Sequence, residues 1–140
     1  HLVCDSKAFI LALRITAGQV HESKAFEGTM AQQLIPDRRG RRRRPDRLAA
    51  DKGYGYPRIR IWCNKRRIKA VIPTRSNQPC EPRFDKAAYR RRNKIERVVG
   101  RYKDYRGLAT RYEKLAVNYL ALWLVAIMDQ ALKRLLPNRP

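Results

Sequence analysis

The stretch LAADKGYG at residues 48–55 decides the fold. Its apolar start, its carboxylate and its two glycines predict a short strand that ends at Asp51 and a turn directly after it. Pro57 suits the first position of a helix over residues 57–65, and Ile68–Ile72 predicts another short strand. A strand, a helix and a strand in succession indicate an α/β layer structure, in which ligands gather at strand ends. Its position at the end of the predicted strand, taken alone, favours an ordinary turn or capping role for Asp51.

Upstream of this stretch, two apolar runs predict strands at His1–Cys4 and Phe9–Thr16. Asp5-Ser6-Lys7 between them has the composition of a turn, so we interpret Asp5 as a turn residue. Ser23 is expected to cap a helix that runs to about Leu34.

Downstream, the sequence predicts two long helices, Lys86–Tyr105 and Thr110–Leu136. Residues 110–113, Thr-Arg-Tyr-Glu, have the spacing of a capping box at the start of the second helix. Residues 119–128 are uninterrupted and apolar, but a membrane span needs about 20 such residues. We therefore expect a helix that is buried against the sheet, and no membrane partner.

The charge of the chain is strongly positive. Lys and Arg number 33 against 12 Asp and Glu, a net charge of +21, which indicates an anionic partner such as nucleic acid. The three cysteines form no metal-binding pattern, which fits a reducing cytosol. The densest basic run predicts either a solvated loop or a loop that follows a DNA backbone. Its arginines are Arg38, Arg39, Arg41, Arg42, Arg43 and Arg44.

A second pattern lies in the helix predicted over residues 86–105. Tyr89, Arg92, Glu96 and Lys103 fall within roughly 60° of one another at about 100° per residue. They would form one polar stripe beside an apolar one, at the edge of the core. The same spacing also fits an exposed charged face with Glu–Arg pairs that contribute little to stability.

The motif Tyr89-x2-Arg92-x3-Glu96-x6-Lys103 resembles the signature around the last carboxylate of DDE transposases from bacterial insertion sequences. The residues 50–54, ADKGY, are similar to the segment with the second catalytic Asp, and together the motifs resemble the insertion-sequence-five (IS-five) group. Residues 18–22, GQVHE, resemble a Gly-Gln-x-His-Asp stretch of this group, with Glu22 in place of the Asp.

This resemblance implies an RNase H-like fold that lacks its first strand and carries a C-terminal helical extension. Residues 1–140 would be a partial DDE transposase catalytic domain, with an RNase H-like core at 1–107, an Arg-rich loop at 37–46 and a C-terminal helix at 108–140. The first catalytic Asp and the usual N-terminal DNA-binding region are absent, so we expect a fragment whose further partner is an upstream-frame N-terminal portion.

The resemblance also implies a chemistry, Mg²⁺-dependent DNA cleavage and strand transfer during transposition. Asp51 and Glu96 would be catalytic residues and metal ligands, in a complete site that holds two Mg²⁺ (or Mn²⁺) ions. Tyr89, Arg92 and Lys103 would support the site or contact DNA. With one carboxylate missing, we expect this chain alone to be inactive.

The implied partners are DNA, as element ends and target, and further copies of the complete protein, in the nucleoid of a bacterial cytoplasm. The alternative is a non-enzymatic basic nucleic-acid-binding protein, which explains the charge but makes the register of Glu96 and Lys103 a coincidence. A membrane-surface protein is a third hypothesis, and it rests only on the charge and one apolar helix.

Overall fold

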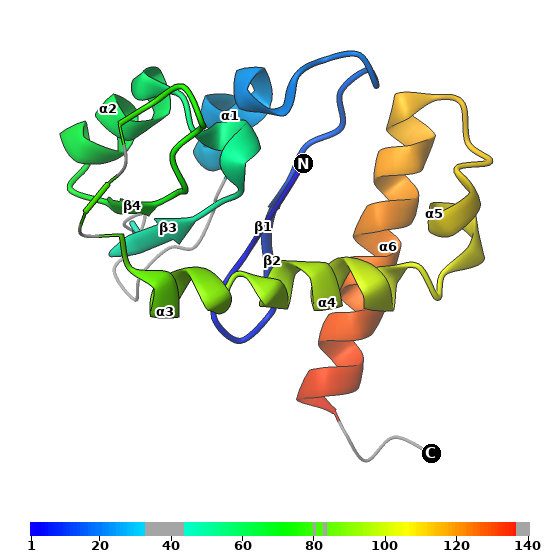
Figure 1. Cartoon of the computed structure of the whole chain (residues 1–140). Helices are drawn as coiled ribbons and strands as arrows, with labels where there is room; N and C mark the ends of the chain where they lie inside the picture. The colour runs from blue at the N-terminus through cyan, green and yellow to red at the C-terminus, as the bar shows by residue number, and fades with distance from the viewer. Residues whose placement is uncertain (33–43, 80, 83, 137–140) are drawn as a thin grey trace.

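The computed structural model describes residues 1–32, 44–79, 81–82 and 84–136 (Figure 1). Short strands and helices follow one another, as expected for a mixed α/β chain, and all four predicted strands are present. The elements are β1 (Leu2–Cys4), β2 (Ile10–Leu13), α1 (Glu22–Ala31), β3 (Arg47–Ala49), the 3-10 helix η1 (Lys52–Tyr54), α2 (Pro57–Lys65), β4 (Lys69–Val71), α3 (Lys86–Arg90), α4 (Asn93–Tyr102), α5 (Arg106–Thr110) and α6 (Ala116–Leu135).

The first two strands form an antiparallel hairpin whose turn is held by Asp5. The Oδ1 atom of Asp5 accepts hydrogen bonds from the backbone N–H groups of Lys7 (2.9 Å) and Phe9 (2.8 Å). Ala8 has a positive φ of 66°, which completes the reversal of the chain. Asp5 is therefore the turn residue that its neighbours predict.

The strands β3 and β4 form a parallel pair, in which Leu48 lies opposite Ala70. Parallel neighbours need a crossover connection, and η1 and α2 supply it. Pro57 stands at the first position of α2, as the sequence predicts. Asp51 lies just beyond the carboxyl end of β3, where a ligand can approach.

The described residues form two separate two-stranded sheets, β1–β2 and β3–β4. The mixed α/β class is thus confirmed, and the RNase H-like arrangement stays a prediction.

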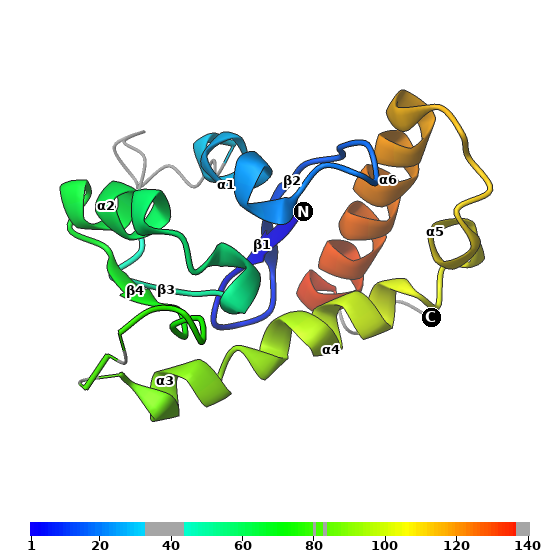
Figure 2. The ribbon, with the colours of Figure 1, turned by 45° about the horizontal axis from the view of Figure 1, so that its top comes forward.

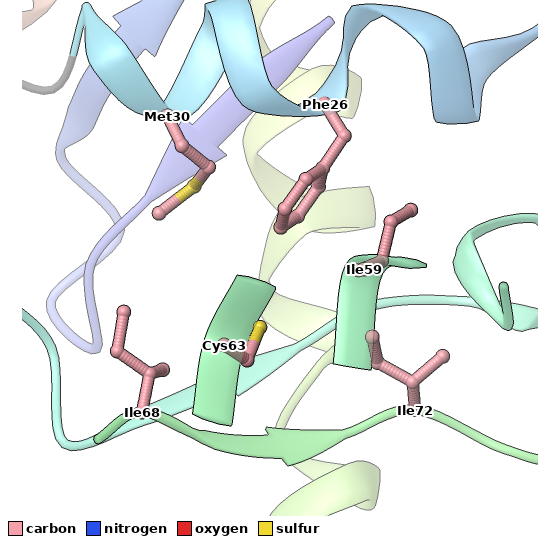
Figure 3. Close-up of a cluster of buried hydrophobic side chains, with 6 residues drawn as sticks. All are labelled: Phe26, Met30, Ile59, Cys63, Ile68 and Ile72. Atoms are coloured by element: carbon pink, nitrogen blue, oxygen red, sulfur yellow. The ribbon is translucent and has the colours of Figure 1, made fainter. Parts of the chain in front are cut away.

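One hydrophobic cluster lies between α1, α2 and β4 (Figure 3). Phe26 and Met30 project from α1 toward side chains of α2 and β4, and the Phe26 ring meets the Trp62 ring edge-on with centroids 5.2 Å apart. Trp62 is therefore a packing residue. The buried members are Phe26, Met30, Ile59, Cys63, Ile68 and Ile72.

A second cluster joins α4, α5 and α6 and consists of Val98, Tyr102, Leu108 and Ala126. The β1–β2 hairpin lies between the two clusters (Figure 2). Val3 packs against the first cluster, while its neighbour Cys4 packs against the second.

The predicted helix over residues 86–105 is divided into α3 and α4. Asp85 caps α3 by accepting a hydrogen bond from the Ala88 N–H at 2.8 Å. After Arg90 the backbone bonds tighten to i→i+3 spacing, from Arg92 N to the Tyr89 carbonyl and from Ile95 N to the Arg92 carbonyl, both at 2.9 Å. The two helices keep nearly the same direction across this break (Figure 2).

The predicted capping box at Thr110 is wrong. Thr110 is the last residue of α5, and its hydroxyl donates back to the Arg106 carbonyl at 2.7 Å. Arg111 then takes a left-handed conformation (φ 50°, ψ 43°) that ends the helix, so α6 begins only at Ala116.

The start of α1 also differs from the prediction. The capping residue is His21 and not Ser23, because the Nδ1 atom of His21 accepts a hydrogen bond from the Ser23 N–H at 3.2 Å. The helix ends at Ala31, and the predicted end at Leu34 lies outside the described residues.

The long helix α6 is only partly buried, contrary to the prediction. Ala126 is 2% exposed, whereas Val117, Val125 and Met128 are 63–69% exposed. The reason is that α6 packs along one side, on α4, α5 and the β1–β2 hairpin, and no strand in the described ranges lies across its other side (Figure 1). None of the helices in the described ranges combines the length and apolarity that a membrane crossing requires.

We predict that truncation inside the first cluster destabilises the fold strongly. Ile59 is fully buried, so Ile59→Ala should lower the free energy of unfolding by about 2–5 kcal/mol through lost burial and a cavity. Ile61 on the same helix is 52% exposed, and Ile61→Ala serves as the matched control with a change below about 1 kcal/mol. Urea denaturation measures both, and equal losses would contradict this packing.

Candidate functional site

Asp51 caps η1 and leaves part of its carboxylate free. Its Oδ1 atom accepts a hydrogen bond from the Gly53 N–H at 2.8 Å, and the residue is half-buried. The local structure is thus that of a capping Asp, while its place after β3 is that of a ligand-binding residue.

A second carboxylate, that of Glu22, approaches the same turn from α1. A Cβ atom built on Gly53 would lie 2.9 Å from Asp51 Oδ1 and 3.1 Å from Glu22 Oε2, so a larger residue would displace these groups. Burial and then the negative charges of Glu22 and Asp51 raise the pKa of Tyr54 to about 12. Asp51, Glu22 and Tyr54 therefore form one electrostatically coupled group, here called the Asp51 turn.

Two side chains from the loop after β4 hold the Asp51 turn in place. Arg75 donates to the carbonyl oxygens of Lys52 (3.3 Å) and Gly53 (3.2 Å). Gln78 donates its Nε2 hydrogen to the Gly55 carbonyl at 2.8 Å. The position of Asp51 thus depends on residues more than twenty positions away in the sequence.

The predicted polar stripe is partly confirmed. Arg92, the residue before α4, donates to Glu96 in the first turn at 2.6 Å, and its guanidinium lies 5.6 Å from the centre of the Tyr89 ring. Burial opposes the charge of Arg92, but the hydrogen bond and charge of Glu96 outweigh it, and the pKa of Arg92 is raised. Lys103 follows the last residue of α4, about 10 Å along the helix from Glu96.

A basic surface surrounds Glu96. Between residues 86 and 106, Lys and Arg outnumber Asp and Glu by nine to two, so the segment is strongly positive. We call the exposed cations of this segment the basic ridge; they are Lys86, Arg90, Arg91, Lys94, Arg97, Lys103 and Arg106. Such a surface suits the phosphates of a nucleic acid.

Of the six arginines in the predicted basic loop, Arg44 alone lies within the described residues. It is exposed and donates to the Arg66 carbonyl at 3.0 Å. The other predicted arginines, Arg38, Arg39, Arg41, Arg42 and Arg43, lie outside the described residues.

The model of the family "Transposase DDE domain" matches residues 1–128. The chain belongs to this transposase family. No curated protein and no solved structure matches it. Membership gives the chain a transposase ancestry, and DDE domains generally bind DNA and use divalent metal ions.

The residues placed in this transposase domain do not by themselves make a complete metal site. Across the described ranges, no group of three or more His, Cys, Asp and Glu side chains is positioned to hold a metal ion. Glu96 is engaged by Arg92, and one oxygen of Asp51 by a backbone N–H. Mg²⁺ is usually held by one or two carboxylates together with waters and phosphate oxygens, so Asp51 and Glu96 can supply only part of such a ligand set.

Glu22 and Arg75 are residues of the transposase domain to which sequence reasoning gave no role. Glu22 appears there only as the last residue of the motif GQVHE, and that motif is the signal that could have drawn attention to it. Nothing local marks Arg75, because its contacts with the Asp51 turn arise only when the chain folds.

We predict that Glu22 adds to the effect of burial in raising the pKa of Tyr54. The folded-state pKa of Tyr54, about 12, lies above the ordinary value near 10, so its protonated form stabilises the fold below pH 10. That contribution is lost as the pH rises from about 10 to 12. Glu22→Gln should lower the pKa of Tyr54, which an NMR titration of the tyrosine ring carbons measures. Glu27→Gln on the same helix is the control, and an unchanged pKa of Tyr54 in Glu22→Gln would contradict the coupling.

Proposed function

We propose that this chain is the C-terminal catalytic-core portion of an insertion-sequence transposase of the IS-five group, with an RNase H-like core over residues 1–107. The family match over residues 1–128 is the observation that carries the proposal. Two further findings support it: Asp51 stands at the carboxyl end of a parallel strand, and Glu96 stands within a basic ridge.

In this proposal Asp51 and Glu96 are two catalytic carboxylates of DNA cleavage and strand transfer. Their side chains would be ligands of Mg²⁺ or Mn²⁺, with two ions in a complete site. Such ions, when bound, stabilise negative charge on phosphate oxygens. Because no three His, Cys, Asp or Glu side chains are grouped to hold a metal ion among the described residues, we propose that the ligand set is completed from outside them and that the chain alone is inactive.

The side chains around Glu96 have separate roles. Arg92 holds Glu96 in one orientation through a 2.6 Å hydrogen bond and is itself packed near Tyr89, so both are positioning residues. Lys103, exposed at the end of α4, is free to meet a phosphate as a mobile point charge. We propose that Arg38–Arg44 contacts DNA together with the basic ridge, at the nucleoid of a bacterial cell.

We predict that the basic ridge binds DNA without sequence preference and with a steep salt dependence. Changing Arg90, Arg91 and Arg97 together to Gln should reduce the slope of log affinity against log salt by up to about 3, because each lost phosphate contact removes about one unit. Fluorescence anisotropy with a labelled duplex measures the slope.

The matched control changes Lys24, Lys65 and Lys114 to Gln, since these exposed cations lie on α1, on α2 and in the connection before α6. It removes the same charge from sites away from the ridge and should change the slope less. Equal effects of the two triple variants would show that net charge and not the ridge governs binding.

A further prediction concerns cleavage. The chain alone should not nick supercoiled plasmid in Mg²⁺ or Mn²⁺. In the complete transposase, Glu96→Gln should reduce cleavage at least about a hundredfold with DNA binding retained. Asp104→Asn, an exposed acid on the same segment, is the control and should cleave normally.

This experiment separates the enzyme from the alternative, a non-enzymatic basic nucleic-acid-binding protein. Full cleavage by the Glu96→Gln transposase would remove Glu96 from the catalytic site. Absence of cleavage from the unaltered complete protein, with salt-dependent binding intact, would favour the alternative.

A further inference from the structure

The helix α6 has two apolar faces, and the structure uses one of them. Ala126 is 2% exposed and belongs to the second hydrophobic cluster, where Trp123 meets Tyr102 at 5.3 Å between ring centroids. Six other large apolar side chains of the same helix are about half exposed or more. They are Val117 (69% exposed), Leu124 (49%), Val125 (65%), Met128 (63%), Leu132 (49%) and Leu135 (69%).

These exposed side chains form a continuous stripe. At about 100° per residue they fall within a band roughly 100° wide, on the side of the helix opposite Ala126 and Trp123. We call this set the outer stripe. The band contains no charged residue, although the chain carries a net charge of +21.

We propose that the outer stripe binds the outer stripe of a second copy of this chain, with the two α6 helices antiparallel. With exposed fractions of 49–69%, the six side chains present about 600 Å² of surface. If both stripes were completely covered, two copies would bury about 1,200 Å², the lower end of specific interfaces. A two-fold pair needs a self-complementary surface, and an uncharged apolar stripe on a strongly basic chain is one.

The spacing along α6 fixes a register. A two-fold axis at the level of Ala126 places Val117 opposite Leu135 of the second copy, and Leu124 opposite its Met128. Apolar residues then meet apolar residues along the whole helix. The spacings of three and four residues within the stripe suit such helix–helix packing.

The charge of the chain shapes the strength of this contact. Two copies of net charge +21 repel one another, and salt screens that repulsion beyond a Debye length of about 8 Å at physiological ionic strength. Dimerisation should therefore strengthen as salt is added, whereas DNA binding weakens. The contact goes beyond the proposed function, because it involves neither the Asp51 turn nor Glu96.

Sedimentation of the chain without DNA tests this proposal. Between about 1 and 100 µM we expect a monomer–dimer equilibrium whose dimer fraction rises with salt. Val125→Glu, close to the two-fold axis, should shift the chain to monomer at every concentration. Ile61→Glu is the matched control, since Ile61 is 52% exposed on α2 and should leave the dimer intact.

A charge exchange tests the antiparallel register. Val117→Lys and Leu135→Glu should each weaken the dimer about tenfold or more, and the double variant should restore it. The two positions lie about 27 Å apart in one helix, so they can pair only between copies.

A monomer at all concentrations, with helical circular dichroism intact, would overturn the proposal. Slow hydrogen exchange of α6 in such a monomer would show that another segment covers the stripe. A dimer that Val125→Glu leaves unchanged would place the interface elsewhere. Cleavage and DNA-binding results bear on the proposed function alone.

Discussion

The hairpin of β1 and β2 is the layer on which both hydrophobic clusters depend. Successive side chains of a strand point to opposite faces, so Val3 reaches the cluster of α1 and α2 while Cys4 reaches that of α4, α5 and α6. The pairing steps from Ala12, opposite Val3, to Ile10, opposite Cys4, so Leu11 is the extra residue of a β-bulge. This irregularity lets Cys4 and Ile10 pack on the same cluster.

Local chemistry explains which parts of the fold the sequence predicts. The strands, α2 and the Asp5 turn follow from proline positions, apolar runs and a side chain that bonds its own backbone. The division of residues 86–105 is not evident from residue types, because a run of arginines also fits a continuous helix. The left-handed Arg111 is not evident either, because the Thr-x-x-Glu spacing around it also fits the start of a helix. The partial burial of α6 is not predictable, because an apolar sequence does not specify whether another element covers each side of the helix.

The candidate site likewise has one feature that the sequence predicts and one that depends on how the chain packs. The pair Arg92–Glu96 is predictable, since residues four apart face one another in a helix. The approach of Glu22 to the Asp51 turn is not predictable, because it depends on how α1 packs beside η1.

The Asp51 turn and the basic ridge also differ in charge, with carboxylates close together at the Asp51 turn and cations in excess around Glu96. At the turn, Lys52 and the Arg75 guanidinium place positive charge near the two carboxylates.

The central position of the hairpin has a consequence for how the molecule opens. Val3 packs against the first cluster, and Cys4 and Ile10 pack against the second, so separating either cluster uncovers one side of the hairpin. The two halves are therefore connected through the hairpin. We expect the amides of β1 and β2 to exchange more slowly than those of the long helix, which is attached along one side only.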